Sequence, residues 1–247
     1  MAVPIDTVYQ RVLALANKEQ RGYITPQEFN LFANQAQMAI YETYFYEKDK
    51  AAFEDSIKGN DTGADMIHMI DEKLKYFYIS GTTAGSGANL TTHYRLDKVF
   101  YTHNGGSWLC QEVSIDELHA ALSGANQPNT PNMIGSNLLQ PFATRPIYHR
   151  NSLSTISVYT STSSSPVTSG VTYSYWRIPI EAKWGYTVVN YEALYDATQT
   201  TDFSLHPSEE SNLVIKILEL AGITLNKPGL IQVANQEEAE VLQMKNS

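Results

Sequence analysis

Apolar residues near the start of the chain recur at intervals of three and four, the spacing that places them on one face of an α-helix. Residues 5–18 carry such a stripe and Gly22 follows it, so a short helix is predicted. The run from Thr25 to Glu28 then forms a capping box, in which the Thr25 hydroxyl accepts from the Glu28 amide. The helix that it opens is expected to run from Pro26 to about Lys50 or beyond.

The glycine-rich run 59–63 is expected to end this helix, and residues 64–74 have a further helical pattern. Residues 75–80 are rich in aromatic and β-branched side chains, so they could form a strand instead. Residues 206–221 return to a helical stripe that Gly222 ends, while residues 226–247 are polar with few apolar positions. We expect this last segment to be an extended arm that becomes ordered on a partner.

The middle of the chain alternates apolar and polar residues, as half-buried strands do. Residues 94–102 and 107–113 flank an Asn-Gly turn, which predicts a β-hairpin. A capping box at Ser114 predicts a short helix ending near Gly124, and residues 127–146 are expected to be irregular. The Ser- and Thr-rich stretch 151–174 interleaves apolar residues and is expected to form strands around a polar turn, and a further strand is expected over residues 171–178.

These elements predict an α+β fold, in which N- and C-terminal helices form one helical layer and a small antiparallel β-domain is inserted between them. The chain is predicted to divide into an N-terminal helical region (1–89) and a β-rich domain (90–200). A C-terminal helix that packs on the N-terminal helices (201–225) and the arm (226–247) follow.

Composition narrows the function classes. The 247 residues carry a formal charge of −9, which argues against a wide basic face for nucleic acid and leaves only passive contact. A single cysteine, Cys110, excludes an internal disulfide framework. No stretch approaches the length of a membrane span and no usual export signal begins the chain, so we expect a soluble protein without membrane contact.

No catalytic, cofactor or metal site is predicted. Asp61-Thr62-Gly63-Ala64 matches a short aspartic-protease signature but lacks the apolar strand that precedes it in those enzymes, so a loop between helices is favoured. The glycines of residues 81–87 lack phosphate-binding spacing, and the six histidines never pair at ligand spacing. Cys110 lies in a predicted strand, where a lone cysteine is usually a small buried apolar residue.

Aromatic residues are dense in two places, in the middle of the long helix and between residues 176 and 195. Tyrosine and tryptophan often anchor protein interfaces, although core packing and carbohydrate stacking explain such clusters too. The combination with a polar arm and an acidic composition favours assembly. The candidate interface residues, taken from these clusters and the arm, are Tyr44, Tyr46, Trp184, Tyr186, Leu230, Ile231, Val233, Val241 and Leu242.

Two blocks of sequence resemble virion structural proteins of tailed phages, and most of all the crAss-like short-tailed phages and their marine relatives that infect Bacteroidetes. The first block covers residues 17–30 and 32–37, and the second covers residues 183–186 and 202–210. The similarity extends from about residue 5 to residue 240. These strings identify relatives without assigning a reaction.

The resemblance implies a non-enzymatic subunit of the portal-to-tail region, an adaptor or ring protein that needs no cofactor. Such a subunit would form a closed ring of about twelve copies, bind the portal protein and further tail or ring proteins, and contact translocating DNA passively. An acidic lumen would keep the duplex from adhering. Its place would be the virion, at the portal vertex, neck or tail, after synthesis in the host cytoplasm.

Two alternatives stay open from the residues. A β-rich receptor- or glycan-binding tail protein would use Trp176, Trp184 and the tyrosine cluster. A hydrolase would depend on Asp61.

Overall fold

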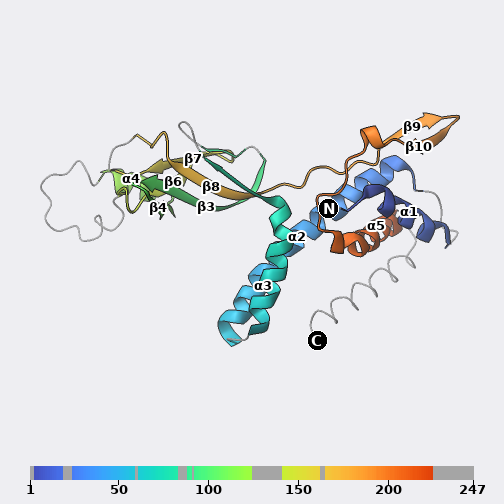
Figure 1. The fold of residues 1–247 in the computed structure, drawn as a ribbon, viewed down its shortest axis with the longest axis horizontal. Helices are drawn as coiled ribbons and strands as arrows, with labels where there is room; N and C mark the ends of the chain where they lie inside the picture. The colour runs from blue at the N-terminus through green and yellow to red at the C-terminus, as the bar shows by residue number, and fades with distance from the viewer. Residues whose placement is uncertain are drawn as a thin grey trace, which may run out of the picture. The chain divides into compact units, whose positions relative to one another are not determined.

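The computed structural model divides the chain into two compact units (Figure 1). Met1–Tyr76 and Pro179–Ser247 form a mainly helical unit, and Phe77–Ile178 form a β-rich unit inserted between them. The predicted α+β class is therefore confirmed. The structure describes residues 3–18, 24–58, 61–82, 88–90, 92–123, 141–161 and 165–224.

Among its described residues, the helical unit contains four α-helices: α1 (Ile5–Lys18), α2 (Pro26–Lys58), α3 (Asp61–Leu74) and α5 (Glu210–Thr224). Helix α2 packs against α3 and α5, and α5 also packs against α1. The predicted capping box forms, since the Thr25 amide donates to Glu28 Oε2 (2.9 Å) and the Glu28 amide donates to Thr25 Oγ1 (3.3 Å). The apolar stripes predicted for α1 and α5 lie in the core, except for Leu15 of α1, which is 44% exposed.

Three side-chain amides on one face of α2 bind an extended segment that follows the inserted unit. Asn30 accepts from the Trp184 amide (2.7 Å) and donates to the Trp184 carbonyl (3.2 Å). Asn34 makes the same pair of bonds with Ala182, at 2.8 and 2.9 Å. Gln37 donates to the Ile180 carbonyl and accepts from the Ser204 amide, both at 2.8 Å. We call Asn30, Asn34 and Gln37 the carboxamide ladder.

The inserted unit is a sandwich of two four-stranded sheets. One has the order β1 (Tyr78–Thr82), β8 (Val171–Arg177), β3 (His93–His103) and β4 (Gly106–Leu109), and the other β2 (Ala88–Asn89), β7 (Thr155–Tyr159), β6 (Ile147–Arg150) and β5 (Gln111–Glu112). Side chains from both sheets share one core, which contains Leu90, Val99, Cys110, Tyr148, Ile156, Val158, Val171 and Tyr175.

A helix forms a third layer of the inserted unit. Leu118 and Ala121 of α4 (Ile115–Ser123) pack with Ile147 and Tyr159 of the second sheet. The prediction of an antiparallel domain needs one correction, because β5 pairs with β6 in parallel. This occurs because the chain passes from β4 directly into the second sheet and returns to it after α4.

The predicted hairpin at the Asn-Gly turn is confirmed. Strand β3 pairs with β4, and Asn104 and Gly105 have φ angles of 49° and 78°. The predicted run 107–113, however, divides between the two sheets.

The unit boundaries differ from the predicted ones. The β-rich unit begins at Phe77 rather than residue 90, because β1 pairs with β8 along its whole length. It ends at Ile178 rather than residue 200, because the carboxamide ladder holds the following segment on α2. The predicted arm, residues 226–247, lies entirely outside the described residues. Of the predicted irregular stretch 127–146, only residues 141–146 are described.

Replacing Gln37 with alanine should lower the free energy of unfolding by about 2 kcal/mol, because both of its backbone partners then lose a bond in a largely buried site. Denaturant unfolding of Gln37→Ala and of Gln35→Ala, an exposed glutamine on the same helix, provides the comparison. The control should change stability by less than about 0.5 kcal/mol. Equal losses for the two variants would contradict a structural role for the ladder.

Two glycines of the inserted unit have the same backbone angle but different surroundings. Gly105 and Gly170 have φ angles of 78° and 79°; a Cβ at Gly105 would meet nothing within 4 Å, whereas one at Gly170 would lie 3.0 Å from the Thr102 carbonyl oxygen. Gly105→Ala should cost about 1 kcal/mol for the left-handed backbone alone. Gly170→Ala should cost clearly more when both are compared by denaturant unfolding, and a smaller cost at Gly170 would argue against this close approach.

Candidate interaction surface

The four predicted interface residues that the structure describes do not form one surface. Tyr46 is exposed at 71%, and Tyr186 is half-buried. Tyr44 and Trp184 are buried, at 2% and 3%, so their prediction as interface residues is wrong. The remaining five, Leu230, Ile231, Val233, Val241 and Leu242, lie outside the described residues.

Trp184 is a core residue because the carboxamide ladder holds its backbone against α2. Its indole N–H donates to Asp6 Oδ1 of α1 (2.9 Å), and its ring lies 4.3 Å from that of Tyr9. The side chain therefore joins α1, α2 and the extended segment, and it is not available to an outside partner.

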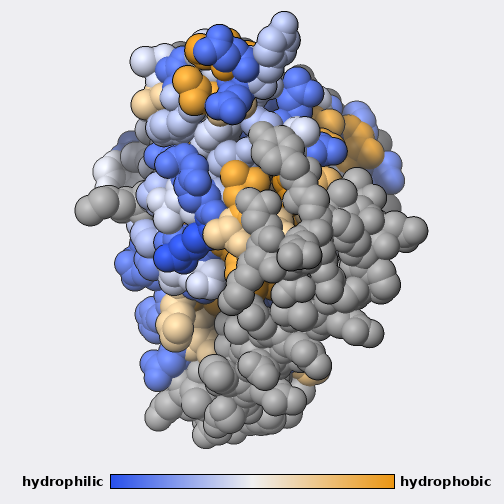
Figure 2. All heavy atoms as spheres, turned by 90° about the vertical axis from the view of Figure 1, so that its right-hand side faces the viewer, coloured by the Kyte–Doolittle hydropathy of each residue, from blue (hydrophilic) through white to orange (hydrophobic). Residues whose placement is uncertain are grey.

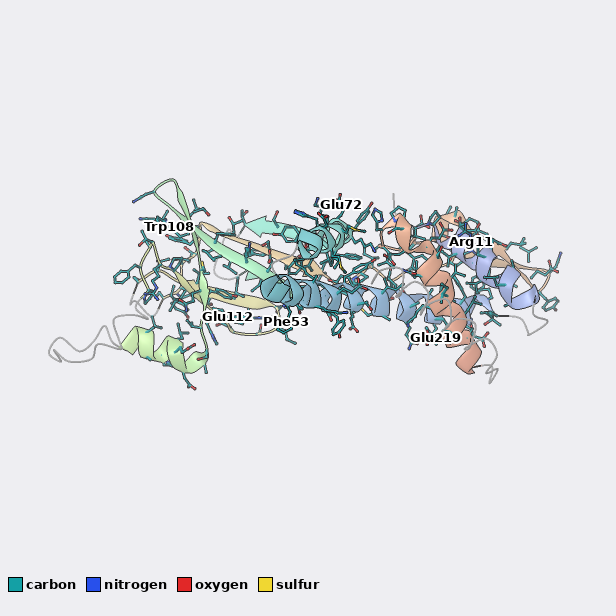
Figure 3. All side chains as sticks on the ribbon, turned by 90° about the horizontal axis from the view of Figure 1, so that it is seen from below. Arg11, Phe53, Glu72, Trp108, Glu112 and Glu219 are labelled. Atoms are coloured by element: carbon teal, nitrogen blue, oxygen red, sulfur yellow. The ribbon has the colours of Figure 1, made fainter. Side chains whose placement is uncertain are left out.

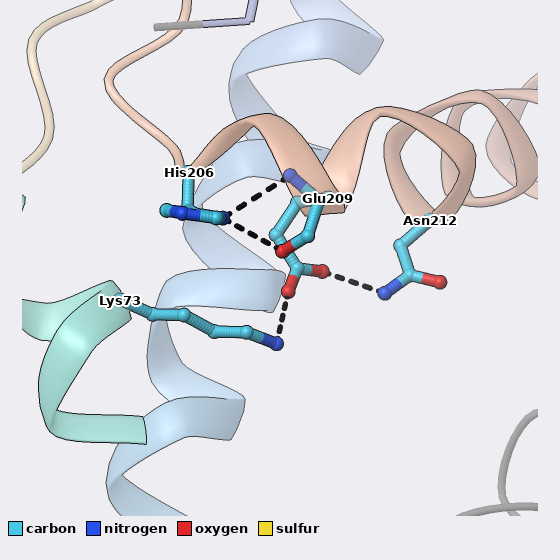
Figure 4. A network of polar contacts seen from close by, with 5 residues as sticks. Lys73, His206, Glu209 and Asn212 are labelled. Carbon is cyan, nitrogen blue, oxygen red and sulfur yellow. Dashed lines mark hydrogen bonds and ion pairs between the residues drawn. The ribbon is translucent and has the colours of Figure 1, made fainter. Parts of the chain in front are cut away.

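Tyr44 lies beside a buried polar cluster between α2, α3 and the start of α5. Figure 4 shows Lys73, Glu209 and Asn212 of this cluster. The Glu209 carboxylate, 2% exposed, accepts from Lys73 Nζ and from Asn212 Nδ2 (2.6 Å). Lys73 Nζ also lies 5.4 Å from the centre of the Tyr44 ring. Burial, helped by the nearby Glu209 charge, raises the pKa of the Tyr44 phenol, which stays protonated. The cluster clamps helices together, because both Glu209 oxygens are occupied by residues of its own unit.

Asp61 and Cys110, the two residues considered for catalysis, lie in positions that do not suit that role. Asp61 is the first residue of α3, whereas the aspartic-protease signature requires the end of a strand. Cys110 is buried in the sandwich core as predicted, and burial raises its pKa to about 12, which disfavours the nucleophilic thiolate.

Across the described residues no group of three or more His, Cys, Asp or Glu side chains could hold a metal ion. None of the helices in that part of the chain is long and apolar enough to span a membrane.

The sequence analysis missed a two-stranded hairpin of the helical unit, which exposes Val188, Val189, Tyr191 and Leu194. Strands β9 (Tyr186–Val189) and β10 (Glu192–Tyr195) pair only with each other among the described strands. One face carries Val188 and Ala193 and the other Val189 and Leu194, since neighbouring residues alternate between faces.

The base of this hairpin is fixed to the core. The rings of Tyr186 and Tyr195 lie 5.9 and 5.8 Å from that of Trp184. The Asp196 carboxylate accepts from the Thr198 hydroxyl and amide, from Gln199 and from Thr187, and these bonds lower its pKa. A Cβ at Gly185 would lie 2.5 Å from the Gln199 carbonyl carbon, so glycine is required where the two chain segments meet.

The tip of the hairpin has the opposite character. Its turn residues Asn190 and Tyr191 both have positive φ, 51° and 68°, as a type I′ turn requires. A tyrosine rarely adopts this backbone conformation, and the Tyr191 side chain is fully exposed. Val188 is 62% exposed, and Figure 2 shows apolar atoms at the surface at the top of the view, where Figure 1 places β9 and β10.

A sequence signal for the hairpin exists. Residues 186–189 and 192–195 are rich in aromatic and aliphatic side chains around Asn190, which tolerates positive φ. The second turn position holds Tyr191 instead of the usual glycine, which weakens the signal.

Lys73→Met should lower the free energy of unfolding by about 3–5 kcal/mol, because Glu209 would keep a buried charge without its cation. Lys75→Met is the matched control, since its ion pair with Glu72 is 68% exposed on both sides and should contribute less than about 1 kcal/mol. Denaturant unfolding of the two variants measures both losses. Adding Glu209→Gln to Lys73→Met should recover part of the loss, and a Lys73→Met variant as stable as the control would contradict the clamp.

A scan against protein-family models and a search of curated proteins found no match to this chain.

Proposed function

We propose that this protein is a non-enzymatic virion subunit of a tailed phage, an adaptor or connector that forms a ring between the portal vertex and the tail. The ring lines the DNA passage and contacts the genome passively. Its partners are further copies of the same chain, the portal protein and other tail or ring proteins. The chain needs no cofactor for this role.

The β9–β10 hairpin is the observation that carries the proposal. A two-stranded hairpin is marginally stable in water by itself, and this one exposes apolar side chains on both faces while its base is tied to Trp184 and Asp196. Association with another protein surface would bury those side chains. It would also add a strand to the two-stranded sheet or cover one of its faces. A fixed base with an uncovered tip suits an element that reaches into a neighbouring subunit.

The strained turn supports the same role. Tyr191 keeps a bulky aromatic ring at a position where glycine would remove the backbone cost. Such conformations often mark functional positions, because a purely structural turn gains nothing from the strain. A fully exposed aromatic ring at an interface offers a large apolar area and one polar group.

The resemblance to phage virion proteins is consistent with these contacts. Both quoted blocks contain residues that hold the base of the hairpin or the helical core, including Asn30, Trp184, Gly185 and Glu209. A scaffold that fixes a projecting hairpin is compatible with a subunit that repeats around a ring through heterologous contacts.

The receptor- or glycan-binding alternative loses support from the structure of the helical unit. It rested on Trp176, Trp184 and the tyrosine cluster, and of these residues Trp184 is buried and Trp176 is half-buried.

Tyr191→Gly separates assembly from folding. Glycine suits the positive φ of the turn, so the variant should be at least as stable as the natural chain in thermal unfolding. Removal of the ring should weaken assembly at least about tenfold. Mass photometry and negative-stain microscopy of the purified protein, alone and with the portal protein of the same virus, measure that assembly.

Leu153→Ser is the control, because Leu153 is 83% exposed on the inserted unit and lies outside the hairpin. It should assemble like the natural chain, as rings or as decorated portals. If the natural chain stays monomeric at high concentration and does not bind the portal protein, the proposed function is contradicted. Glycan binding would then be the next property to measure.

A further inference from the structure

We propose that one end of the sandwich, where Arg150 and Arg177 flank His93, binds a phosphate group. The ligand is free phosphate or a phosphate monoester, held by the two guanidinium groups. The site lies entirely within the inserted unit, so this inference goes beyond the proposed function and does not rest on it.

The three residues lie where β3 begins and where β6 and β8 end. His93 and Arg177 are directly opposite each other in the β3–β8 pair, on the face that carries the core residue Tyr175 two positions before Arg177. Arg150 belongs to the other sheet, and its Nη2 lies 2.8 Å from His93 Nε2. One guanidinium therefore reaches His93 across the sandwich, and the other stands beside it on the neighbouring strand.

The hydrogen bonds of His93 decide the charge of this cluster. The Arg150 guanidinium can only donate, so His93 Nε2 accepts. The Leu90 carbonyl oxygen, 2.6 Å from His93 Nδ1, can only accept, so Nδ1 carries the hydrogen. A ring that makes both bonds is neutral. It orients Arg150 and leaves the two arginine charges as the charge of the site.

The positive charge of the cluster lacks an internal counter-charge. Arg150 is half-buried and makes no ion pair within the part of the chain that the structure describes. Arg177, also half-buried, has other contacts, but its buried Nε has no hydrogen-bond acceptor among the described residues. Partly desolvated guanidinium groups gain strongly from charge-assisted hydrogen bonds to an oxoanion.

The carboxylates of the inserted unit are few and are placed elsewhere. Residues 77–178 contain five Lys or Arg and four Asp or Glu, so the acidic excess of the chain lies outside this unit. None of the four forms an ion pair with either arginine: Asp97, Glu112, Asp116 and Glu117. Glu112 accepts from the Tyr148 hydroxyl (3.0 Å), and Figure 3 shows it where β5 leads into α4.

The amount of charge favours phosphate over a single carboxylate. A phosphate monoester carries a charge of about −1.5 to −2 at pH 7 and presents three acceptor oxygens. Two guanidinium groups match that charge, and the planar fork of each can donate to two oxygens at once. Acetate, with one charge, would leave one arginine uncompensated.

Isothermal titration calorimetry of the full-length chain with sodium phosphate tests the site. The natural chain should bind phosphate, and Arg150→Met and Arg177→Met should each raise the Kd at least about tenfold, because each removes charged hydrogen bonds. A natural chain that releases no heat of binding with phosphate would overturn the inference.

Arg145→Met is the matched control, since it removes the same charge from an exposed position of the same unit. Its Kd should change less than about twofold, because salt screens the charge of a distant exposed residue. An equal loss in the control and in Arg150→Met would overturn the site. Thermal unfolding without phosphate checks that each variant is folded, and Arg150→Lys replaces Arg150→Met if the latter is not.

The positioning role of His93 has its own pair of variants. His93→Phe removes the acceptor for Arg150 without changing the charge, so it should weaken phosphate binding. His93→Gln keeps a side-chain acceptor and should restore most of the affinity. Equal affinities for His93→Phe and the natural chain would overturn this role.

Competition on the natural chain tests the class of ligand without any substitution. Sulfate, a tetrahedral dianion, should displace phosphate, whereas acetate at the same ionic strength should not. Displacement by acetate as strong as by sulfate would overturn the match of charges. Phenyl phosphate distinguishes the two sources of the group: binding equal to that of phosphate supports a monoester, and much weaker binding supports the free ion.

Discussion

The carboxamide ladder on α2 is the interaction on which the arrangement of the helical unit depends. Each asparagine presents a donor and an acceptor to the backbone of one residue, as a neighbouring β-strand would. The geometry fits because four residues of helix rise about 6 Å and two residues of extended chain span nearly the same distance. Asn30 and Asn34 can therefore bind Trp184 and Ala182 in succession, with the extended segment running antiparallel to the helix. Gln37 reaches the next alternate residue, Ile180.

Several features follow from the ladder. It places Trp184 in the core, where the ring supports Tyr186 and Tyr195 at the base of the hairpin. Gln37 also binds Ser204 and so guides the chain toward α5, where the Lys73–Glu209 pair forms a second clamp. Hydrogen bonds of Asp196 and ring contacts with Trp184 fix the hairpin base, while nothing in the described chain covers its tip. That contrast supports an element that is completed by a second copy.

The inserted unit is organised by different physical means. Its two sheets share an apolar core, and α4 covers the far side of one of them, so the unit has its own three layers. Both ends of its chain lie beside each other in the β1–β8 pair, where Tyr78 is opposite Trp176. An insertion whose ends are paired in this way can be accommodated between α3 and the extended segment without disturbing the ladder.

The sequence alone was sufficient for local structure. Apolar spacing and capping boxes identified α1, α2, α4 and α5, and the Asn-Gly turn identified the β3–β4 hairpin, because these features depend on residues close together in the chain. It was not sufficient where contacts join distant segments. The amides of α2 look like ordinary polar positions until residues 180–184 lie on them, so the sequence placed Trp184 and Tyr44 at an interface and set the β-domain limits at residues 90 and 200. Only the tertiary structure decided which aromatic residues are buried and which hairpin stays exposed, because burial depends on what packs against a residue as well as on its own type.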